Sequence, residues 1–431
     1  MQINGRDIMK HEKKSGRVAW FAWIAAAIFY LYEYAVRIAP SVMEHELAVE
    51  FSASAATMGT VLGAYYLVYA PLQLFAGLLF DRFGGKKVLV PASILVSIGC
   101  LCMIIPSNSL LYITAGRILA GVGSSCAFIG VMYLAAVWFH ENKLAFLSGL
   151  ATSLGICGAL LGQAPLSVLI DKSGWRMSLV LLAIIGLVTF IIVYLFIPQT
   201  PHWEKEKQQI AKSDRSSLAN FVAGLISVCR NKQTWIVGLV ASCLYMPTVV
   251  FGDLWGVQYM RSALGLHKAE AAKVTSMLYI GWLIGGPLIG LLSDLIGCRR
   301  KLLVFGCFLS TIFFSVVLIC PIQSPFIIGL LLFLAGISSS PQVICFVASL
   351  EANLPSAKGS AIAVVNMIVM FVGGIFQPIV GWLMGRNSTY GTEAIPHIAF
   401  RNALLTMPIL TFVGLLLSLF IKKGIDKRAL R

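Results

Sequence analysis

The chain has 431 residues, of which 58% are hydrophobic and only 12% are charged. Soluble domains carry about 25% charged residues, so the composition excludes an ordinary soluble domain and predicts a protein that lies in a lipid bilayer. The formal net charge of +15 needs no nucleic-acid partner, because the placement of the basic residues described below accounts for it.

Twelve apolar runs are long enough to cross a membrane, since a spanning helix needs about 20 mostly apolar residues. They lie at residues 18–43, 57–80, 88–105, 110–139, 144–170, 177–197, 233–258, 272–292, 302–320, 325–349, 359–385 and 403–421. The first run follows Lys13, Lys14 and Arg17 as in a signal peptide, but it continues to about Met43 and is too long for one. We therefore predict an all-α membrane protein with twelve transmembrane helices, the first of which is not cleaved.

Lys and Arg residues are unevenly distributed between the loops. With the amino terminus placed in the cytoplasm, most of the 33 basic residues fall on the cytoplasmic side, and only Arg37 and Arg117 lie within helices. This asymmetry is the positive-inside bias. It predicts that both termini are cytoplasmic and that the basic tails lie against anionic lipid headgroups.

One short pattern, Gly-x3-Asp-x2-Gly-x-basic-basic, occurs twice, once in each half of the chain. The first copy comprises Gly77, Asp81, Arg82, Gly84, Lys86 and Lys87, and the second comprises Gly290, Asp294, Gly297, Arg299 and Arg300. The offset in numbering from Asp81 to Asp294, called the repeat offset below, also relates Gly123 to Gly336 and Pro165 to Pro378. We therefore predict two six-helix bundles in parallel orientation, related by an axis along the membrane normal.

The repeat divides the chain into five parts. The predicted parts are a cytoplasmic amino tail at 1–17, a first six-helix bundle at 18–197, a cytoplasmic linker at 198–232, a second six-helix bundle at 233–421 and a cytoplasmic carboxyl tail at 422–431. In the linker, Pro198, Pro201 and a charged run interrupt the apolar pattern. We expect the linker to contain a short amphipathic helix on the cytoplasmic surface, and to tether the halves rather than to form a binding site.

Each copy of the pattern lies in a very short loop between two predicted helices. Gly77 and Gly290 are expected to allow close packing at helix ends, and Gly84 and Gly297 to allow a tight reversal of the chain. The Asp can face the positive amino-terminal end of a helix from the other half, while the basic residues meet helix carboxyl ends, opposing carboxylates and headgroups. A topology anchor made of positive charge alone would not require an Asp and two glycines at fixed spacing, so we favour a gating role.

This paired loop motif strongly resembles the signature of the major facilitator superfamily of solute carriers. Two further stretches are similar to family motifs. Gly116–Gly123, which contains Arg117, resembles the Arg-and-glycine motif of helix 4. Gly155–Pro165 resembles the glycine–proline motif associated with antiporters, for which tight helix packing is an equally good interpretation.

The resemblance covers nearly the whole chain. It implies that two six-helix bundles rock around a site at the membrane midplane, and that the loop motifs latch the cytoplasmic side while the carrier is open outward. It also implies a monomer in the inner (plasma) membrane of a bacterium.

Four ionisable residues, Glu33, Arg37, Arg117 and Asp253, are predicted to be embedded in the membrane. A charge at the bilayer centre costs about 2.5–3.5 kcal/mol, which makes these residues functional candidates. Glu33 and Arg37 share one helix face, where they either neutralise one another or line a central cavity. In a cavity, Arg37 would bind a carboxylate in two-pronged geometry, and Glu33 would bind an amine or a transported proton.

The other two embedded charges also have alternatives. In the family, the position of Arg117 lies near the cavity and often supports proton coupling or orients helix 1; alternatively, Arg117 donates hydrogen bonds to backbone carbonyls. Asp253 is expected to approach Arg37 when the outer side closes, forming a gate, and is with Glu33 a candidate for a coupling proton. The polar residues that we place at the cavity are Tyr30, Tyr34, Tyr65 and Asn366.

One embedded acid and one embedded base on the same helix suit a zwitterion. Residues and resemblance together predict a secondary active transporter, a symporter or antiporter, of an amino acid or short peptide. The chain is similar to bacterial carriers loosely related to the lysosomal dipeptide transporters, although charged residues of that branch on helices 4 and 5 are replaced here by Gly123-Ser124-Ser125 and Ser153-Leu154-Gly155. One alternative is a carrier of a small organic carboxylate, held by Arg37 and Arg117 with Glu33 serving protons. Another is a sensor with a carrier fold that does not transport.

An enzyme is not expected from this sequence. Neither a nucleophile–base pair nor a phosphate-binding Gly-x4-Gly-Lys-(Ser/Thr) pattern occurs in it. The ten cysteines fall in predicted helices or cytoplasmic loops, so no external disulfide is predicted. Because no His lies near Cys100 and Cys102 in the sequence, we predict neither a metal site nor another cofactor.

Overall fold

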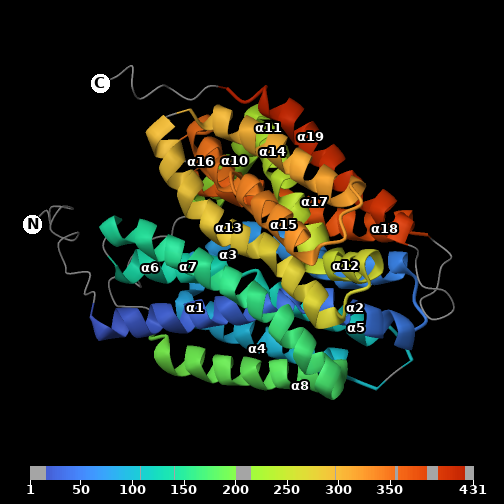
Figure 1. Cartoon of the computed structure of the whole chain (residues 1–431). Coiled ribbons are helices and arrows are strands. Elements are labelled where there is room, and N and C mark those ends of the chain that lie inside the picture. Colours follow the sequence, from blue (N-terminus) through green and yellow to red (C-terminus); the bar gives the residue numbers. More distant parts are fainter. Residues whose placement is uncertain are drawn as a thin grey trace, which may run out of the picture.

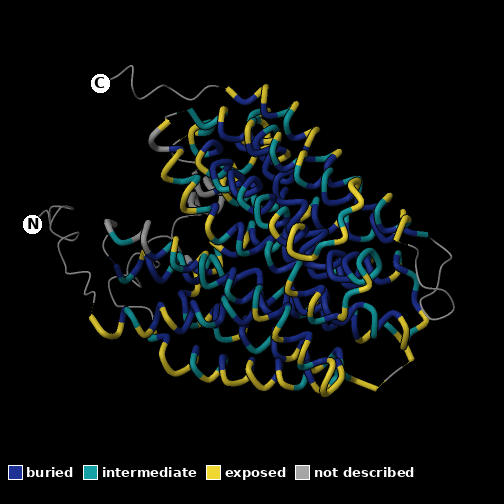
Figure 2. The backbone as a smooth tube through the Cα atoms, in the orientation of Figure 1, coloured by how far each residue is buried: buried dark blue, intermediate teal, exposed yellow. Residues whose placement is uncertain are grey.

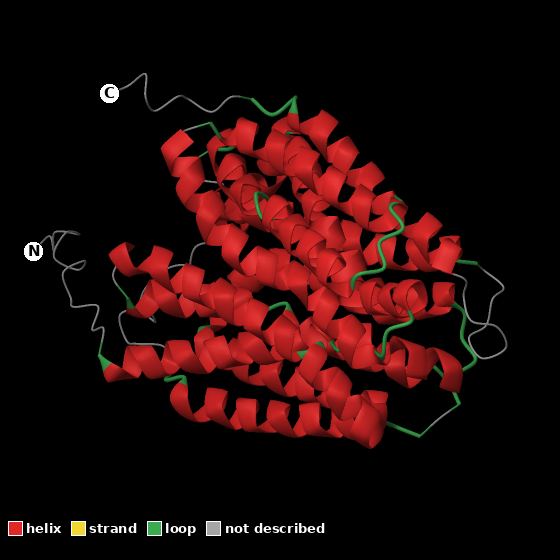
Figure 3. Ribbon diagram, viewed as in Figure 1, coloured by secondary structure: helices red, strands yellow, loops and turns green. Residues whose placement is uncertain are grey.

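The computed structural model describes residues 16–106, 108–139, 141–199, 215–296, 298–354, 358–385 and 397–422. All regular elements in these ranges are helices (Figure 3). The predicted tails lie almost wholly outside the described residues, as do Gly297 and the first part of the linker.

The first half of the chain forms helices that run back and forth along one bundle (Figure 1). Their bounds are α1 (Arg17–Ile38), α2 (Pro40–Glu50), α3 (Ala55–Phe83), α4 (Gly85–Met103), α5 (Leu111–Ser124), α6 (Ala127–Trp138), α7 (Glu141–Leu161) and α8 (Ala164–Phe196). Proline at the start of α2 is compatible with a new helical turn but cannot continue the ladder of α1 without loss of a hydrogen bond. The first apolar run is therefore two helices in series.

The second half forms a second bundle beside the first (Figure 1). After the linker helix α10 (Arg215–Arg230), the elements are α11 (Lys232–Met246), the π-helix η2 (Pro247–Trp255), α12 (Gly256–Leu264), α13 (Lys268–Ile296), α14 (Arg299–Ile319), α15 (Pro325–Ser339), α16 (Gln342–Ala352), α17 (Lys358–Leu383), α18 (His397–Leu404) and α19 (Thr406–Ser418). Both bounds of α13 are those of α3 shifted by the repeat offset. The sequence repeat is thus also a repeat of structure.

Eleven stretches of the described chain are long and apolar enough to span a membrane. One of them, Leu147–Phe196, has 50 residues, more than twice the length that one crossing needs. It is broken at Gly174, whose φ of 79° and ψ of 163° are not helical. Counting the two parts separately gives twelve crossings, which confirms the predicted all-α membrane fold.

The outside of the molecule is apolar. Exposed residues follow the outer helix faces while buried residues line the inner ones (Figure 2), and Phe326, Phe420 and Leu195 are 79%, 68% and 65% exposed. Side chains of this kind are costly to place in water but not in lipid. The exposed apolar surface is therefore the surface of a protein embedded in a bilayer.

The two bundles meet along α3 and α17. A Cβ on Gly59 would lie 2.7 Å from the carbonyl oxygen of Gln377, and one on Gly381 would lie 2.3 Å from that of Ala55. The helices approach so closely only because both positions lack a side chain. Below, the end of the molecule where α3 meets α4 is called the motif-loop end, and the end where α2 meets α3 is called the far end.

At the motif-loop end, Gly84 alone separates α3 from α4, and its φ of 79° is one that glycine adopts without strain. This confirms the predicted reversal in the first copy of the motif. The close packing predicted for Gly77 and Gly290 is wrong, because a Cβ on either glycine would meet no atom within 4 Å. Both glycines lie on a side of their helix that faces open space rather than a neighbouring helix.

The basic residues of the motifs contact their own halves. Arg299 forms an ion pair with Glu351 of α16 at 2.8 Å, and the Lys86 amine lies 4.7 Å from the ring centre of Tyr194 on α8. Arg82 and Lys87 are exposed and Arg300 is half-buried. The side chains of Asp81 and Asp294 are outside the described part of the structure, so the predicted contact across the halves stays a prediction.

The predicted linker helix is present as α10. Val228 is fully buried, while Val222 and Ile226 on other faces are 43% and 47% exposed. The buried face packs against Val364 and Ile368 of α17, in a cluster that Leu74 of α3 also contacts. The linker helix therefore packs against the second half of the chain.

Gly158 of α7 and Gly162, which follows that helix, set the position of α1. A Cβ on Gly158 would lie 2.2 Å from the carbonyl oxygen of Leu31, and one on Gly162 would lie 2.6 Å from that of Ala35. These contacts fix the stretch of α1 that carries Glu33. They support the packing interpretation of the glycine–proline stretch.

Replacing Gly158 with Ala should therefore destabilise the protein, because the added methyl group meets backbone rather than a movable side chain. We expect a loss of about 1–3 kcal/mol, the usual cost of overpacking, measured as a lower midpoint of thermal unfolding in detergent. Gly149→Ala in the same helix is the matched control, since its Cβ would meet nothing within 4 Å. Equal midpoints for the two variants would contradict the packing account.

Candidate functional site

The four embedded charges are all buried, and Asp253 has contacts from both halves. Glu33, Arg37, Arg117 and Asp253 are 0%, 2%, 2% and 3% exposed. Two are acids and two are bases, so their formal charges sum to zero. Buried charges persist only when they are paired or hydrogen-bonded, and the contacts below supply the partners.

Glu33 and Arg37 form an ion pair one helical turn apart on α1. Arg37 Nη2 donates to the two carboxylate oxygens of Glu33 at 3.0 and 3.2 Å. Tyr65 of α3 donates to Glu33 Oε2 at 2.9 Å and accepts from Arg37 Nε at 3.3 Å, while Tyr69 accepts from Arg37 Nη2 at 3.1 Å. Two tyrosines of one helix therefore hold both members of the pair.

Aromatic rings also cover the Arg37 guanidinium. Its central carbon lies 4.2 Å from the ring centre of Tyr34 and 4.8 Å from that of Tyr69, distances typical of cation–π contacts. Its third nitrogen, Nη1, has no hydrogen-bond partner among the described residues. Arg37 thus keeps one donor that the protein does not use.

Arg117 has a different environment. Its Nε donates to the carbonyl oxygen of Leu62 at 3.1 Å, and its Nη1 donates to that of Val36 at 3.3 Å. The guanidinium also lies 4.6 Å from the ring centre of Tyr65. These contacts brace α5 against α1 and α3, which supports the alternative in which Arg117 bonds backbone carbonyls.

Asp253 lies in the π-helix η2, a rare wide-turn geometry that often occurs at functional sites. Its carboxylate accepts hydrogen bonds from the hydroxyls of Tyr66 on α3 and Tyr279 on α13. A Cβ on the neighbouring Gly252 would lie 2.8 Å from the Tyr279 hydroxyl, so a larger residue there would displace that hydroxyl. Asp253 therefore receives one donor from each half.

Tyr66 and Tyr279 occupy equivalent positions, because the repeat offset relates their numbers. The two equivalent residues converge on a single carboxylate, which places Asp253 near the axis that relates the halves. The sequence interpretation passed over Tyr66, Tyr69, Tyr245 and Tyr279 as site residues. The repeat offset was the signal that could have identified the first and the last of them.

The remaining predicted cavity residues are distributed as follows. The Tyr34 hydroxyl lies 2.9 Å from that of Tyr245 on α11, which joins the halves. Tyr30 packs edge-on against Tyr34 with ring centres 5.6 Å apart. Asn366 lies outside this cluster: it donates to Gln73 of α3, nearer the motif-loop end.

The expected contact between Arg37 and Asp253 is not among the ion pairs of the described residues. Arg37 has Glu33 as its charged partner, and Asp253 has the two tyrosines. A direct pair between them in another conformation stays a prediction.

At the far end, polar contacts join the halves in two layers. The Lys268 amine on α13, 6% exposed, lies 2.5 Å from Glu46 of α2 and 2.8 Å from Asp171 of α8. Closer to the site, Gln163 donates to the carbonyl oxygen of Gly252 and accepts from Ser276, both at 2.8 Å. These contacts close the far end in this structure.

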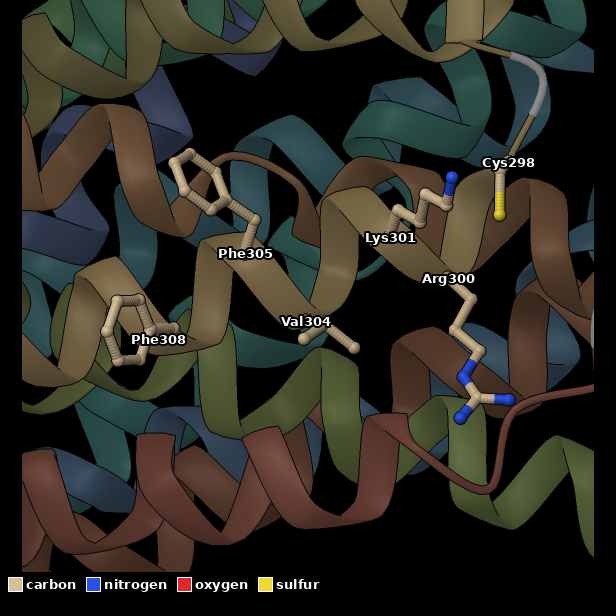
Figure 4. A pocket seen from close by; sticks show the side chains of 6 residues that line it. All are labelled: Cys298, Arg300, Lys301, Val304, Phe305 and Phe308. Atoms are coloured by element: carbon tan, nitrogen blue, oxygen red, sulfur yellow. The ribbon is translucent and has the colours of Figure 1, made fainter.

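One hollow of the described chain lies away from this charged site. A hollow of about 430 Å³ lies along α14, lined by Cys298, Arg300, Lys301, Val304, Phe305 and Phe308 (Figure 4). Phe305 and Phe308 are 58% and 48% exposed, so this hollow is on the apolar outer surface. In the described ranges no three His, Cys, Asp or Glu side chains are grouped to hold a metal ion.

Curated relatives match the chain at low identity. A probable sulfoacetate transporter of Cupriavidus necator is 23% identical over 62% of this chain and 63% of its own length. The hexuronate transporter of Bacillus subtilis is 23% identical over 91% of this chain and 86% of its own. A glycine betaine/proline/ectoine/pipecolic acid transporter of Dickeya dadantii is 26% identical over 82% and 72%.

A solved structure shows the same fold. A bacterial homologue of the human lysosomal transporter Spinster, in an inward-facing and unoccupied conformation, superposes with a TM-score of 0.75 at 15% identity over 94% of this chain and 98% of that one. The family model of the Major Facilitator Superfamily matches residues 22–378 and 254–429. The chain therefore belongs to the Major Facilitator Superfamily and is a secondary transporter of that kind.

Proposed function

We propose that the protein carries a small zwitterion, an amino acid or a short peptide, across the membrane by alternating access. The observation that carries the proposal is the balance of charge among the embedded residues. The four embedded charges, Glu33, Asp253, Arg37 and Arg117, sum to zero, and a zwitterion leaves that sum unchanged. A lone carboxylate would add an uncompensated charge to a water-poor site, which is costly.

The recognition groups follow from the free hydrogen-bonding capacity. Arg37 Nη1 is an unused guanidinium donor and suits the carboxylate end of the solute. One end of the solute is then bound by the first half, and the other, the amine, by Asp253, which is held between the halves.

Alternating access would open the far end by separating the contacts described above. The Lys268 ion pairs, the Gln163 hydrogen bonds and the Tyr34–Tyr245 contact all cross between the halves. With the amino terminus in the cytoplasm, as the basic residues indicate, the far end faces outward. The loop motifs would latch the cytoplasmic end in the outward-open state.

A second candidate is a carrier of a small organic carboxylate with a proton on Glu33 or Asp253 restoring neutrality. The observation that favours it is that two relatives are named for anions, sulfoacetate and hexuronate. The relative named for glycine betaine and proline favours the zwitterion instead. Both candidates use Arg37 to bind a carboxylate. They differ at Asp253, which binds the amine of the solute in the first candidate and can carry a proton in the second.

Replacing Arg37 with Lys should weaken solute binding at least about ten-fold, because an ammonium keeps the charge beside Glu33 but has no planar fork. The measurement is a thermal-shift titration in detergent with the twenty L-amino acids, L-alanyl-L-alanine, pyruvate and succinate. A solute at 100 times its dissociation constant should stabilise the parent protein by about 2.7 kcal/mol. Unchanged affinity in Arg37→Lys would assign Arg37 a structural role.

Replacing Asp253 with Asn removes the charge and keeps one acceptor oxygen for a tyrosine hydroxyl, while the amide NH2 can donate to the other hydroxyl. The zwitterion proposal expects uptake of amino acids or the dipeptide into proteoliposomes to fall at least about ten-fold, since a charged hydrogen bond contributes about 1.5–3 kcal/mol. Glu50→Gln, which neutralises a partly exposed acid of the far end, is the matched control. Retained uptake of pyruvate or succinate, with loss of its pH dependence, would instead support the carboxylate candidate.

Replacing Lys268 with Gln should shift the protein towards a state open at the far end, because Glu46 and Asp171 then repel one another without a cation between them. Spin labels at Asn108 and Gln323, exposed far-end residues of the two halves, should report more long distances in double electron–electron resonance, in a background without native cysteines. A distance distribution equal to that of the parent would show that Lys268 does not hold the far end closed.

A further inference from the structure

Trp282 of α13 has a buried hydrogen-bond donor without an acceptor. The side chain is 7% exposed, and its Nε1 makes no hydrogen bond with any described residue. Buried tryptophans usually find a partner for this N–H, and a buried donor that lacks one requires an explanation. A bound molecule that supplies the missing acceptor would provide this explanation.

The position of Trp282 connects it to the charged site. Its ring packs edge-on against that of Tyr245, with ring centres 5.7 Å apart. The Tyr245 hydroxyl lies 2.9 Å from that of Tyr34, whose ring covers the Arg37 guanidinium at 4.2 Å. A continuous row of aromatic contacts therefore runs from Arg37 in the first half to Trp282 in the second.

Both ends of this row carry an unused N–H donor. One is Arg37 Nη1 and the other is Trp282 Nε1. Unused donors at both ends of the row suit a molecule that brings oxygen atoms. Such a molecule would touch both halves at once.

The repeat supports the same assignment. Trp282 is related to Tyr69 by the repeat offset and so occupies the equivalent position in the second half. Tyr69 contacts the buried guanidinium of Arg37 in the first half. The second half offers Trp282 no such charged partner among its described residues, so the equivalent polar atom, Nε1, is left without a partner.

We propose that the indole N–H of Trp282 donates a hydrogen bond to an oxygen atom of the bound solute and so determines specificity from the second half. This inference rests on the proposed function, because it takes the solute to be one that Arg37 binds by its carboxylate. With Arg37 on one side and Trp282 on the other, bound solute draws the halves together. That contact links occupancy of the site to closure around it.

The test is Trp282→Phe, which keeps an aromatic ring against Tyr245 and removes the N–H. Affinity is measured by thermal-shift titration with the panel of the twenty L-amino acids, L-alanyl-L-alanine, pyruvate and succinate. The panel member that stabilises the parent protein should bind the variant at least about ten-fold more weakly, which is about 1.4 kcal/mol. The unfolding midpoint without solute should stay within a few degrees of the parent, because no protein hydrogen bond is lost.

Trp23→Phe is the matched control. Trp23 is 1% exposed and its Nε1 also has no partner among the described residues, but it lies well before Glu33 in the sequence, about 15 Å away along α1. The same chemical change there should leave affinity unchanged. An equal loss in both variants would mean that the effect is structural, and would overturn the proposal.

The remaining outcomes separate this inference from the proposed function. Parent and Trp282→Phe binding an amino acid equally well would overturn the contact, as expected if an internal water satisfies the N–H, and would leave the zwitterion proposal standing. Binding of only pyruvate or succinate by the parent would overturn the zwitterion proposal, and the contact would be judged on that carboxylate by the same ten-fold criterion. A panel in which nothing stabilises the parent would overturn both.

Discussion

The carboxylate of Asp253 is buried at the boundary between two bundles, and it is held there by one hydroxyl from each of them. In a water-poor environment a carboxylate without donors is very costly, so the two tyrosines are a condition for its presence. Because Tyr66 and Tyr279 are equivalent in the repeat, any movement of one bundle relative to the other changes the donors of this group. Asp253 is therefore placed to contact the solute and to change its hydrogen bonds when the halves move.

The two halves share a backbone plan but differ in chemistry. The positions equivalent to Glu33 and Arg37 in the second half are Met246 and Val250, so the ion pair occurs on one side only. Tyr69 and Trp282 likewise occupy one repeat position with different polar atoms. A symmetric scaffold with asymmetric side chains gives a bound molecule a defined orientation. It also concentrates the fixed charges on α1, whose position the glycines at and just after the end of α7 set.

Much of the fold could be predicted from the sequence because run length and repetition depend on single helices. The lengths of the apolar runs gave the crossings, and the repeat offset predicted α13 from α3. The shared helix face of Glu33 and Arg37 followed from spacing, whereas their pairing, one of two alternatives, is given by the structure. Where a prediction needed to know which face of a helix meets a neighbour, spacing was insufficient: Gly77 and Gly290 face open space, and Asn366 bonds Gln73 rather than joining the charged cluster. The partners of Asp253 come from two other helices, and the only signal for them in the sequence is that the repeat offset relates Tyr66 to Tyr279.

The central claim is that a charge-balanced site between the halves accepts a zwitterion. Counterflow exchange in proteoliposomes that contain only the purified parent protein tests it most directly, with labelled amino acids, L-alanyl-L-alanine, pyruvate and succinate offered separately. The account predicts exchange of at least one amino acid or the dipeptide, blocked by an excess of the same unlabelled solute. Exchange of pyruvate or succinate alone would contradict it.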